Sequence, residues 1–368
     1  MDLLLALAIA LALFHFGFPL SYYLYLKRKW LNKPWDIRRD PSYRPRVSII
    51  LPTYNEAEFI RERLDNIYNQ DYPRELVELI VADSGSNDGT IESIKEWKLT
   101  HENFNLKLVI ETEKKGKLYA LLKALDHLST KSEIAILTDA DAFWEPDALG
   151  KAVSYFADPS VGSVTACIYY NDNNVHENVY RNYYNVIRVA ESKIYATPVH
   201  NGPFLAIRSD LVKKYGIPDF PGSDDSSFGS YIAFLGYRAI QADDIVVKEP
   251  IRGNQMRRRI RRAHHLIINF LETKKFTIKK MVYKRNNAFE KIWRIEWCLH
   301  IINPWLLLLS TLLLLYKTLN RILLASTLLI IGIVLLAEKS YRVWVQQQIY
   351  LLFGMMKALR RREVAWKK

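Results

Sequence analysis

The N-terminal stretch Leu3–Leu26 contains 24 residues without one Asp, Glu, Lys or Arg. About 20 apolar residues are enough for a helix to cross a bilayer. Asp2 precedes this run and a Lys-Arg-Lys cluster follows it at 27–29, whereas a cleaved signal peptide carries its positive charges first. The positive-inside rule places the basic end in the cytoplasm. We therefore expect residues 1–29 to form a retained transmembrane anchor.

Two further apolar runs lie near the other end of the chain. Trp297–Tyr316 spans 20 uncharged residues, and Ile322–Ala337 spans 16. The second run would be about 24 Å long as a helix, against a hydrocarbon core of about 30 Å, so a full crossing and a re-entrant segment both stay open. We expect a transmembrane hairpin over residues 293–338, and both flanks of the hairpin in the cytoplasm.

The net charge of +13 is unevenly distributed. From Arg252 onward there are 24 Lys/Arg against 5 Asp/Glu, which leaves a balance of −6 for residues 1–251. The basic part is interleaved with apolar runs, which favours an anionic membrane surface over nucleic acid. We therefore expect basic interfacial helices at 255–292 and a basic interfacial tail at 339–368. The two cysteines show neither disulfide nor zinc spacing.

Strand-like and helix-like stretches alternate between the anchors. Apolar strands are predicted at 46–51, 77–82, 106–110 and 134–137, and helical spacing separates them. This alternation predicts a mostly parallel α/β sheet in a cytoplasmic domain at 44–254. The polar turns follow the strands, so they should line one crevice at the carboxyl edge of the sheet.

The last of these strands ends in Thr138 and delivers Asp139 and Asp141. In an extended segment these two side chains would face the same side. Carboxylates sparsely placed suit Mg²⁺ or Mn²⁺ holding a diphosphate, because such ions keep substrate oxygens in their shell. A solvated turn is the alternative for this pair alone.

Several motifs together resemble the inverting glycosyltransferases of family 2. They are VSIILPTYNE, DSGSNDGT, GKLYALLKAL, TDAD, GPFLAIR and SDDSSFGSYIAFLGYR, in the family's order across residues 46–260. The resemblance implies a GT-A fold, a Rossmann-like domain. With the membrane flanks, the chain is similar to small members of the cellulose-synthase and dolichyl-phosphate-mannose-synthase groups.

The resemblance also implies a set of site residues. Asp225 matches the general base, which would deprotonate an acceptor hydroxyl, although an acid at this place can also cap a helix. Asp141 matches the metal ligand, and Asp139 would contact the donor sugar. The other residues implied to bind the donor are Pro52, Tyr54, Glu56, Asp83, Lys117, Gly202 and Arg208. An Asx-turn is the alternative role for Asp83.

One motif departs from the family pattern. Processive relatives carry Q-x-x-R-W, whereas this chain has Gln255-Met-Arg-Arg258-Arg259. Gln255 and Arg258 keep the implied contact with the donor diphosphate, since an arginine fork matches phosphate oxygens. In those relatives the tryptophan stacks beneath an acceptor sugar. Arg259, at the same place in this chain, offers no such apolar platform. A membrane-surface helix over 255–271 is compatible with both roles.

These observations predict a cell-membrane glycosyltransferase that depends on Mn²⁺ or Mg²⁺ and has a cytoplasmic catalytic domain. Three spans are too few to line an export channel, which favours transfer of one or a few sugars to a lipid-linked glycan or a polyprenyl phosphate. The resemblance favours mannose from GDP-mannose. The alternatives are a UDP-sugar-dependent polysaccharide synthase and a non-catalytic nucleotide-sugar or lipid binder.

Overall fold

A single eight-stranded sheet forms the centre of the computed structural model, in the order β3-β2-β1-β4-β7-β6-β8-β5. The structure describes residues 2–111, 116–170, 175–220, 225–250, 255–283 and 286–360. The strands are β1 (Val47–Thr53), β2 (Val77–Asp83), β3 (Leu106–Ile110), β4 (Ile134–Leu137), β5 (Phe143–Trp144), β6 (Val161–Tyr170), β7 (Leu205–Arg208) and β8 (Arg238–Glu249).

Helices separate most of the strands and continue to the C-terminal part of the chain. They are α1 (Leu3–Lys29), α2 (Ile60–Tyr68), α3 (Thr90–Thr100), α4 (Lys117–Leu125), α5 (Ala148–Ser154), α6 (Val175–Ile194), α7 (Ser209–Tyr215), α8 (Asp225–Phe234), α9 (Gln255–Lys279), α10 (Asn287–Trp297), α11 (Asn303–Leu319), α12 (Leu323–Leu335) and α13 (Lys339–Arg360). Short helical turns lie at Arg74–Leu76 and Tyr155–Ala157, and a π-helical turn at Cys298–Ile302 joins α10 to α11.

The first half of the sheet is parallel. β1 lies between β2 and β4 and runs parallel to both, and β2 runs parallel to β3. β7 then pairs antiparallel with β4 and with β6. The mostly parallel α/β sheet predicted from the sequence is therefore confirmed, and the carboxyl ends of β1 to β4 meet at one edge.

β1 extends two residues beyond its predicted end, through Pro52 and Thr53. The carbonyl of Ile50 accepts from the N–H of Thr138 at 3.1 Å, so Ile50 and, two residues later, Pro52 face β4. β4 has ended by then, and the missing N–H of proline leaves no ladder bond unmade. The turn after β1 therefore begins at Tyr54.

Helices cover both faces of the sheet because alternate residues of β1 point to opposite sides. Ile49 and Leu51 belong to a core shared with α2, α3 and α5. Ile50 belongs to a second core shared with α4, α8, α9 and α10. The helices α9 and α10 are thus part of the packing of the sheet.

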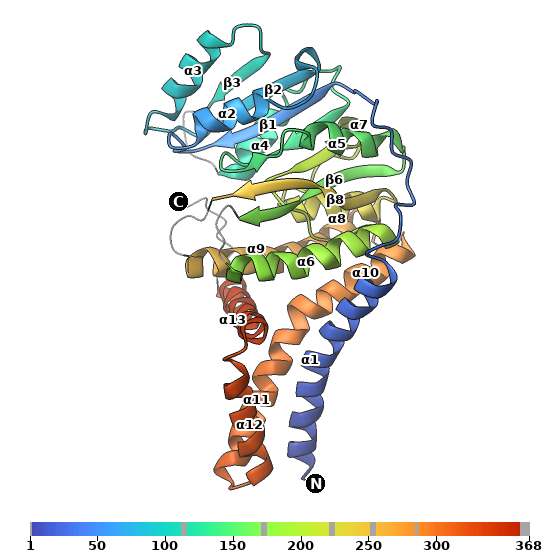
Figure 1. Cartoon of the computed structure of the whole chain (residues 1–368), viewed down its shortest axis with the longest axis vertical. Helices are drawn as coiled ribbons and strands as arrows, with labels where there is room; N and C mark the ends of the chain where they lie inside the picture. The colour runs from blue at the N-terminus through green and yellow to red at the C-terminus, as the bar shows by residue number, and fades with distance from the viewer. Residues whose placement is uncertain are drawn as a thin grey trace.

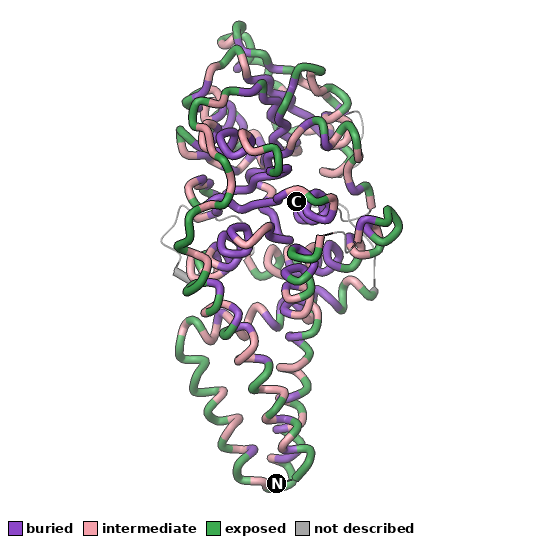
Figure 2. Tube along the Cα trace, turned by 90° about the vertical axis from the view of Figure 1, so that its right-hand side faces the viewer, coloured by how far each residue is buried: buried purple, intermediate pink, exposed green. Residues whose placement is uncertain are grey.

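A stalk of helices projects from the α/β unit (Figure 1). α1, α11 and α12 form the stalk, and α6 and α9 run across its top. Buried residues concentrate in the α/β unit, whereas most of the stalk is exposed or half-buried (Figure 2). Its exposed side chains are mainly leucine, isoleucine and other apolar residues, which is the surface expected of helices in contact with lipid.

Within the described residues, two helical segments are long and apolar enough to cross a membrane, Leu3–Lys29 and Asn287–Leu319. α12 and α13 together pass the same criterion, but they are bent by 105° at their junction. Because α12 has only 13 residues, it covers about 20 Å by itself. The third apolar run is accordingly the shortest in the structure, and α13 turns back to pack on α9.

Trp293 packs inside the protein. Its side chain is 1% exposed and lies in the second core, with its ring centroid 5.6 Å from that of Phe270 and 5.9 Å from that of Phe234. It is buried because α10 packs against the α/β unit, whereas α11 continues into the stalk.

Candidate active site

Two polar turns are joined to each other at the carboxyl edge of the parallel strands. The N–H of Asn55, in the turn after β1, donates to Ser86 Oγ at 2.8 Å, and the N–H of Asn87 donates to Asn55 Oδ1 at 3.0 Å. Asn55 has a φ of 53°, a left-handed conformation that asparagine tolerates better than most residues. These bonds fix the two loops that follow β1 and β2 as one rim.

The residues predicted to bind the nucleoside lie along this rim. Pro52 is buried at the end of β1, and Tyr54 is half-buried beside it. Glu56 is buried, and its N–H donates to Thr90 Oγ1 at 2.8 Å, at the start of α3. The structure brings the three together as expected, and their contact with a nucleoside stays a prediction.

Asp83 is the last residue of β2, and its side chain accepts hydrogen bonds from β1 and from the loop after β2. Its Oδ2 accepts from Thr53 Oγ1 at 2.8 Å and from Ser86 Oγ at 2.6 Å, and its Oδ1 accepts from the N–H of Ser86 at 2.8 Å. The residue has no exposed surface. The backbone donor lies three residues on, rather than two as in the Asx-turn considered for Asp83, but the role is similar because the bonds shape the loop after β2.

Asp139 and Asp141 follow β4 in a turn rather than in the extended segment expected from the sequence. β4 ends at Leu137, and the N–H of Ala142 approaches the carbonyl of Asp139 at 3.4 Å. Asp139 is half-buried and forms an ion pair with Lys117, at the start of α4. The predicted donor contacts Lys117 and Asp139 thus lie side by side.

A buried arginine lies behind the two aspartates. The Arg63 guanidinium donates to Thr138 Oγ1 at 2.8 Å and lies over the Trp144 ring at 4.3 Å. Burial lowers the pKa of Arg63 to about 9, and the negative charges of Asp139 and Asp141 oppose the shift, so it is a cation at neutral pH. Sequence reasoning missed Arg63, although a charge between Ile60 and Leu64 on an apolar helix face was the available signal.

Gly202 allows two carboxylates to approach each other. A Cβ at Gly202 would lie 2.5 Å from Asp225 Oδ2 and 3.4 Å from Asp139 Oδ2. Gly202 lies in the loop that precedes β7, and Asp225 is the first residue of α8. The absence of a side chain at Gly202 therefore lets the predicted base lie next to the predicted donor contact.

Burial raises the pKa of Asp225 above its usual value. The nearby Lys117 ammonium lowers it, and the Asp139 carboxylate raises it. Burial and a like charge both favour the protonated form of a carboxyl group. A carboxyl shifted in this way is a better proton acceptor once it is ionised. Its neighbours Ser223 and Asp224 lie outside the described residues.

α9 faces the two aspartates with its first turns. Gln255 and Arg258 lie in the first two turns, and Arg261 follows one turn later. Burial and the like charges of Arg258 and Arg262 lower the pKa of the Arg261 guanidinium, whereas Asp139 and Asp141 raise it. Sequence reasoning missed Arg261, because five arginines in the eight residues 255–262 give no indication of which side of the helix faces the site.

Arg208 lies away from these residues. It pairs with Ile134 at the beginning of β4, whereas Asp139 follows the end of that strand. Its guanidinium donates to the backbone carbonyls of Phe156, Asp158 and Val161 at 2.6 to 2.7 Å. The structure therefore does not bring Arg208 to the carboxylates, and it instead binds the chain around the start of β6.

The donor set of this edge fits a divalent cation held together with a substrate. Among the described residues, no group of three or more His, Cys, Asp or Glu could hold a metal ion. Mg²⁺ and similar ions are commonly bound by one or two carboxylates together with substrate phosphates. Asp141, two residues after Asp139, would supply a ligand of this kind, with the cations Lys117 and Arg261 nearby for phosphate oxygens.

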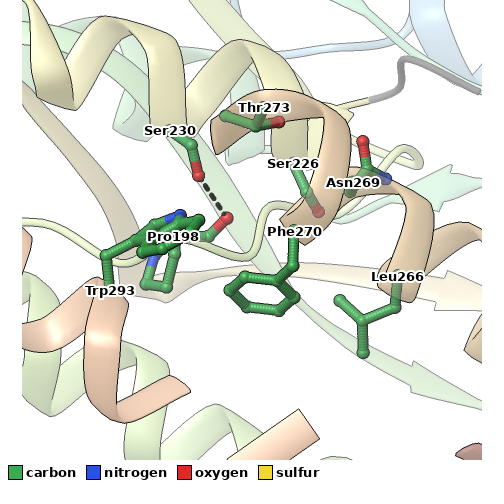
Figure 3. A pocket seen from close by; sticks show the side chains of 8 residues that line it. All are labelled: Pro198, Ser226, Ser230, Leu266, Asn269, Phe270, Thr273 and Trp293. Carbon is green, nitrogen blue, oxygen red and sulfur yellow. Dashed lines mark hydrogen bonds between the residues drawn. The ribbon is translucent and has the colours of Figure 1, made fainter. Parts of the chain in front are cut away.

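A small cavity of about 10 Å³ lies behind the first turn of α8, between α8, α9 and α10 (Figure 3). Asn269 Nδ2 and Thr273 Oγ1 are buried in its wall and have no hydrogen-bond partner in the described part of the chain. The volume is close to that of one water molecule, which could satisfy both atoms. Asn269 Oδ1 also accepts from Ser227 Oγ, so α9 holds the turn that carries Asp225.

Family models match most of the chain. The model for glycosyl transferase family 2 matches residues 48–216, and that for glycosyl transferase family group 2 matches residues 134–338. Among solved structures, the mannosyltransferase PcManGT from Pyrobaculum calidifontis, in complex with GDP-Man and Mn²⁺, is 43% identical. The alignment covers 98% of this chain and 100% of that chain, with a TM-score of 0.89.

Curated relatives match part of the chain. The dolichyl N-acetyl-α-D-glucosaminyl phosphate 3-β-D-2,3-diacetamido-2,3-dideoxy-β-D-glucuronosyltransferase of Methanococcus voltae is 30% identical over 161 residues, which are 42% of this chain and 46% of the relative. Glycosyltransferase AglE of Haloferax volcanii is 33% identical over 120 residues, 33% of this chain and 38% of the relative. The chain thus spans less than half the length of both.

The full-length structural agreement confirms the predicted GT-A fold. The matched residues include the turns after β1, β2 and β4 and the helices that carry Asp225 and Arg258. Since one of the two family models alone spans more than half of the sequence, the chain belongs to the family 2 glycosyltransferases.

Proposed function

We propose that this glycosyltransferase is membrane-anchored and metal-dependent, and transfers mannose with inversion from GDP-mannose to a lipid-linked glycan on the cytoplasmic side. The similarity to PcManGT, which extends over both full chains and includes the stalk, carries the proposal. That protein was solved with GDP-Man and Mn²⁺. The name of the Methanococcus voltae relative supports a lipid-linked acceptor.

The chemistry requires one base and a set of cations. As the acceptor oxygen bonds to the anomeric carbon, the bond from that carbon to the diphosphate oxygen breaks, and Asp225 takes the acceptor's hydroxyl proton. A single displacement of this kind inverts the anomeric configuration. Lys117, Arg258 and Arg261 would receive the diphosphate. A divalent cation, when bound at Asp141, supplies further neutralisation of the leaving group.

The position of α9 supports an acceptor that comes from the membrane. α9 lies at the top of the stalk (Figure 1), and its first turns face Asp139 and Asp141. The exposed apolar residues Met256, Leu271 and Ile278 on the same helix suit a lipid interface. A membrane-embedded acceptor would therefore meet the donor beside Arg258.

Calorimetry with GDP and UDP, each with and without Mn²⁺, tests the donor. We expect GDP to bind more tightly than UDP, and Mn²⁺ to increase the affinity. A transfer assay with labelled GDP-mannose should then give short products on a lipid-linked glycan, and Asp225→Asn should abolish transfer while nucleotide binding stays within a few-fold of wild type.

Other results would contradict the proposal in identifiable ways. Tighter UDP binding would refute the mannose donor, and long polymers would indicate a polysaccharide synthase. If Asp225→Asn stays fully active, Asp225 is not the base. Transfer to polyprenyl phosphate alone would replace the glycan acceptor, because a phosphate oxygen needs no base to become a nucleophile.

A further inference from the structure

Glu111 lies buried at the same edge as the nucleoside rim, directly after β3. Its side chain and backbone together are 3% exposed. In the register of the sheet, Asp83 pairs with Ile110, and the N–H of Glu111 donates to the carbonyl of Asp83 at 2.8 Å. Glu111 is therefore the residue that extends this edge beyond Asp83.

Only one oxygen of the Glu111 carboxylate is engaged. Oε2 accepts from Ser84 Oγ at 2.9 Å, whereas Oε1 is buried and has no hydrogen-bond partner among the described residues. A buried carboxylate oxygen without a donor is costly and calls for an explanation. The bond from Ser84 Oγ fixes the orientation of the carboxylate and leaves Oε1 as its unmatched oxygen among the described residues.

The spacing of the strands would allow one bound nucleotide to reach from Asp139 and Asp141 to Glu111. The edge runs in the order β3, β2, β1, β4, and Asp139 and Asp141 follow β4. Three strand spacings separate β3 from β4, or about 14 Å, which is of the order of an extended nucleoside diphosphate. With the diphosphate at the aspartates, the base lies beside β2 and β3.

Asp83 is less able than Glu111 to accept hydrogen bonds from a nucleotide base. Both of its oxygens already accept hydrogen bonds from Thr53 and Ser86. Glu111 Oε1 is the carboxylate oxygen at this end of the rim that retains its full accepting capacity in the described part of the chain.

A carboxylate oxygen at this place selects among bases by chemistry. Guanine presents two adjacent donors, N1–H and the N2 amino group, on one edge. Uracil presents a single N3–H between two carbonyl acceptors, which a carboxylate would repel. Hydrogen bonds to a charged acceptor are the stronger ones, and an unmatched buried polar group is penalised.

We propose that Glu111 determines specificity for guanine by accepting hydrogen bonds from the N1–H and N2 amino edge of the donor base. The proposal rests on the proposed function, since it presumes a guanosine diphosphate sugar. It gives Glu111 the contact with the base and leaves Asp83 the role of shaping the turn.

Inosine diphosphate is the sharpest probe, because it is GDP without the N2 amino group. We expect wild-type protein to bind GDP about tenfold or more tightly than inosine diphosphate, and to discriminate further against UDP. In Glu111→Gln the loss should fall mainly on GDP, so that the ratio of GDP to inosine diphosphate affinity moves close to one. Glu96→Gln, at an exposed position on α3, is the matched control and should leave this ratio unchanged.

A second variant guards against misfolding of Glu111→Gln. Ser84→Ala leaves the carboxylate in place but removes the bond that orients it, so it should lower the same ratio in part. If both variants retain the wild-type ratio, the assignment of Glu111 is refuted. If instead wild-type protein prefers UDP, the proposed function itself fails, and the two failures are distinguishable by the wild-type measurement alone.

Discussion

Gly202, Asp139 and Asp225 meet at a point where no side chain larger than hydrogen fits on the glycine. Lys117 is the cation shared by both carboxylates, since it pairs with Asp139 and lowers the pKa of Asp225. Burial and Asp139 act in the opposite direction. The ionisation of the base is therefore set by the balance between one cation, one anion and the exclusion of water.

Lys117→Met should move the acid limb of the pH profile of kcat to higher pH. Asp225 must be ionised to accept a proton, so activity is lost as the pH falls through its pKa. Without the ammonium that pKa rises, and the limb follows it. The pH at which the limb lies is the diagnostic measurement. The maximum value of kcat should also fall in this variant, because the donor diphosphate loses its proposed contact with Lys117. Lys123→Met, two turns further along α4, should leave the limb in place, and an unmoved limb in Lys117→Met would contradict the coupling.

Some of these residues could be predicted from the sequence and others could not. Asp139, Asp141 and Asp225 follow strand or loop signals in a fixed order, so pattern and resemblance found them. Arg208 fitted the same pattern, but antiparallel pairing of β7 carries it to the opposite edge. Arg63 and Glu111 stand out because each is buried and has a side-chain atom without a hydrogen-bond partner among the described residues. Neither property can be read from the sequence.

At the scale of elements, α9 and α13 pack with almost no space between them. A Cβ at Gly354 on α13 would lie 2.8 Å from the N of His264 and 3.0 Å from the C of Ala263 on α9. Both atoms are backbone, so they cannot rotate away as a side chain would. The sequence predicted each helix but not this contact, because one glycine in a helix gives no sign of its partner.

Gly354→Ala should therefore destabilise the protein by about 1–3 kcal/mol. The added methyl group separates α13 from α9, and this outweighs the better helix propensity of alanine. Thermal unfolding in detergent measures the effect as a lower Tm. Gly332→Ala on α12 is the control, because its nearest atom, Tyr341 Oη, lies 3.6 Å from the new Cβ. An equal Tm for Gly354→Ala and wild type would contradict the packing argument.

At the scale of the whole molecule, the stalk brings distant parts of the chain to one tip. Asp2, at the start of α1, forms an ion pair with Lys317, in the last turn of α11. The N-terminus and the turn after α11 thus lie at the end of the stalk away from the α/β unit (Figure 1). The sequence predicted this arrangement from the apolar runs, which indicate a hairpin at 293–338, and from the basic cluster at 27–29, which lies at the other end of the first span.

Cysteine labelling tests the orientation. Asn320→Cys places a thiol at the exposed turn after α11, and Lys98→Cys places one on the exposed surface of α3. In intact cells, a membrane-impermeant maleimide should label Asn320→Cys but reach Lys98→Cys only after permeabilisation. Cys167 is buried and Cys298 half-buried, so the unsubstituted protein gives the background. The reverse labelling pattern would contradict a cytoplasmic catalytic domain.

The π-helical turn at Cys298–Ile302 has a mechanical consequence. It joins α10, which is packed beneath the sheet, to α11 in the stalk, and the helix is not interrupted from Asn287 to Leu319. The α/β unit and the stalk are therefore joined by one continuous helix. If the stalk crosses a bilayer as proposed, this helix sets the distance from the bilayer to Asp139 and Asp225, and an acceptor would reach them only with a spacer of matching length.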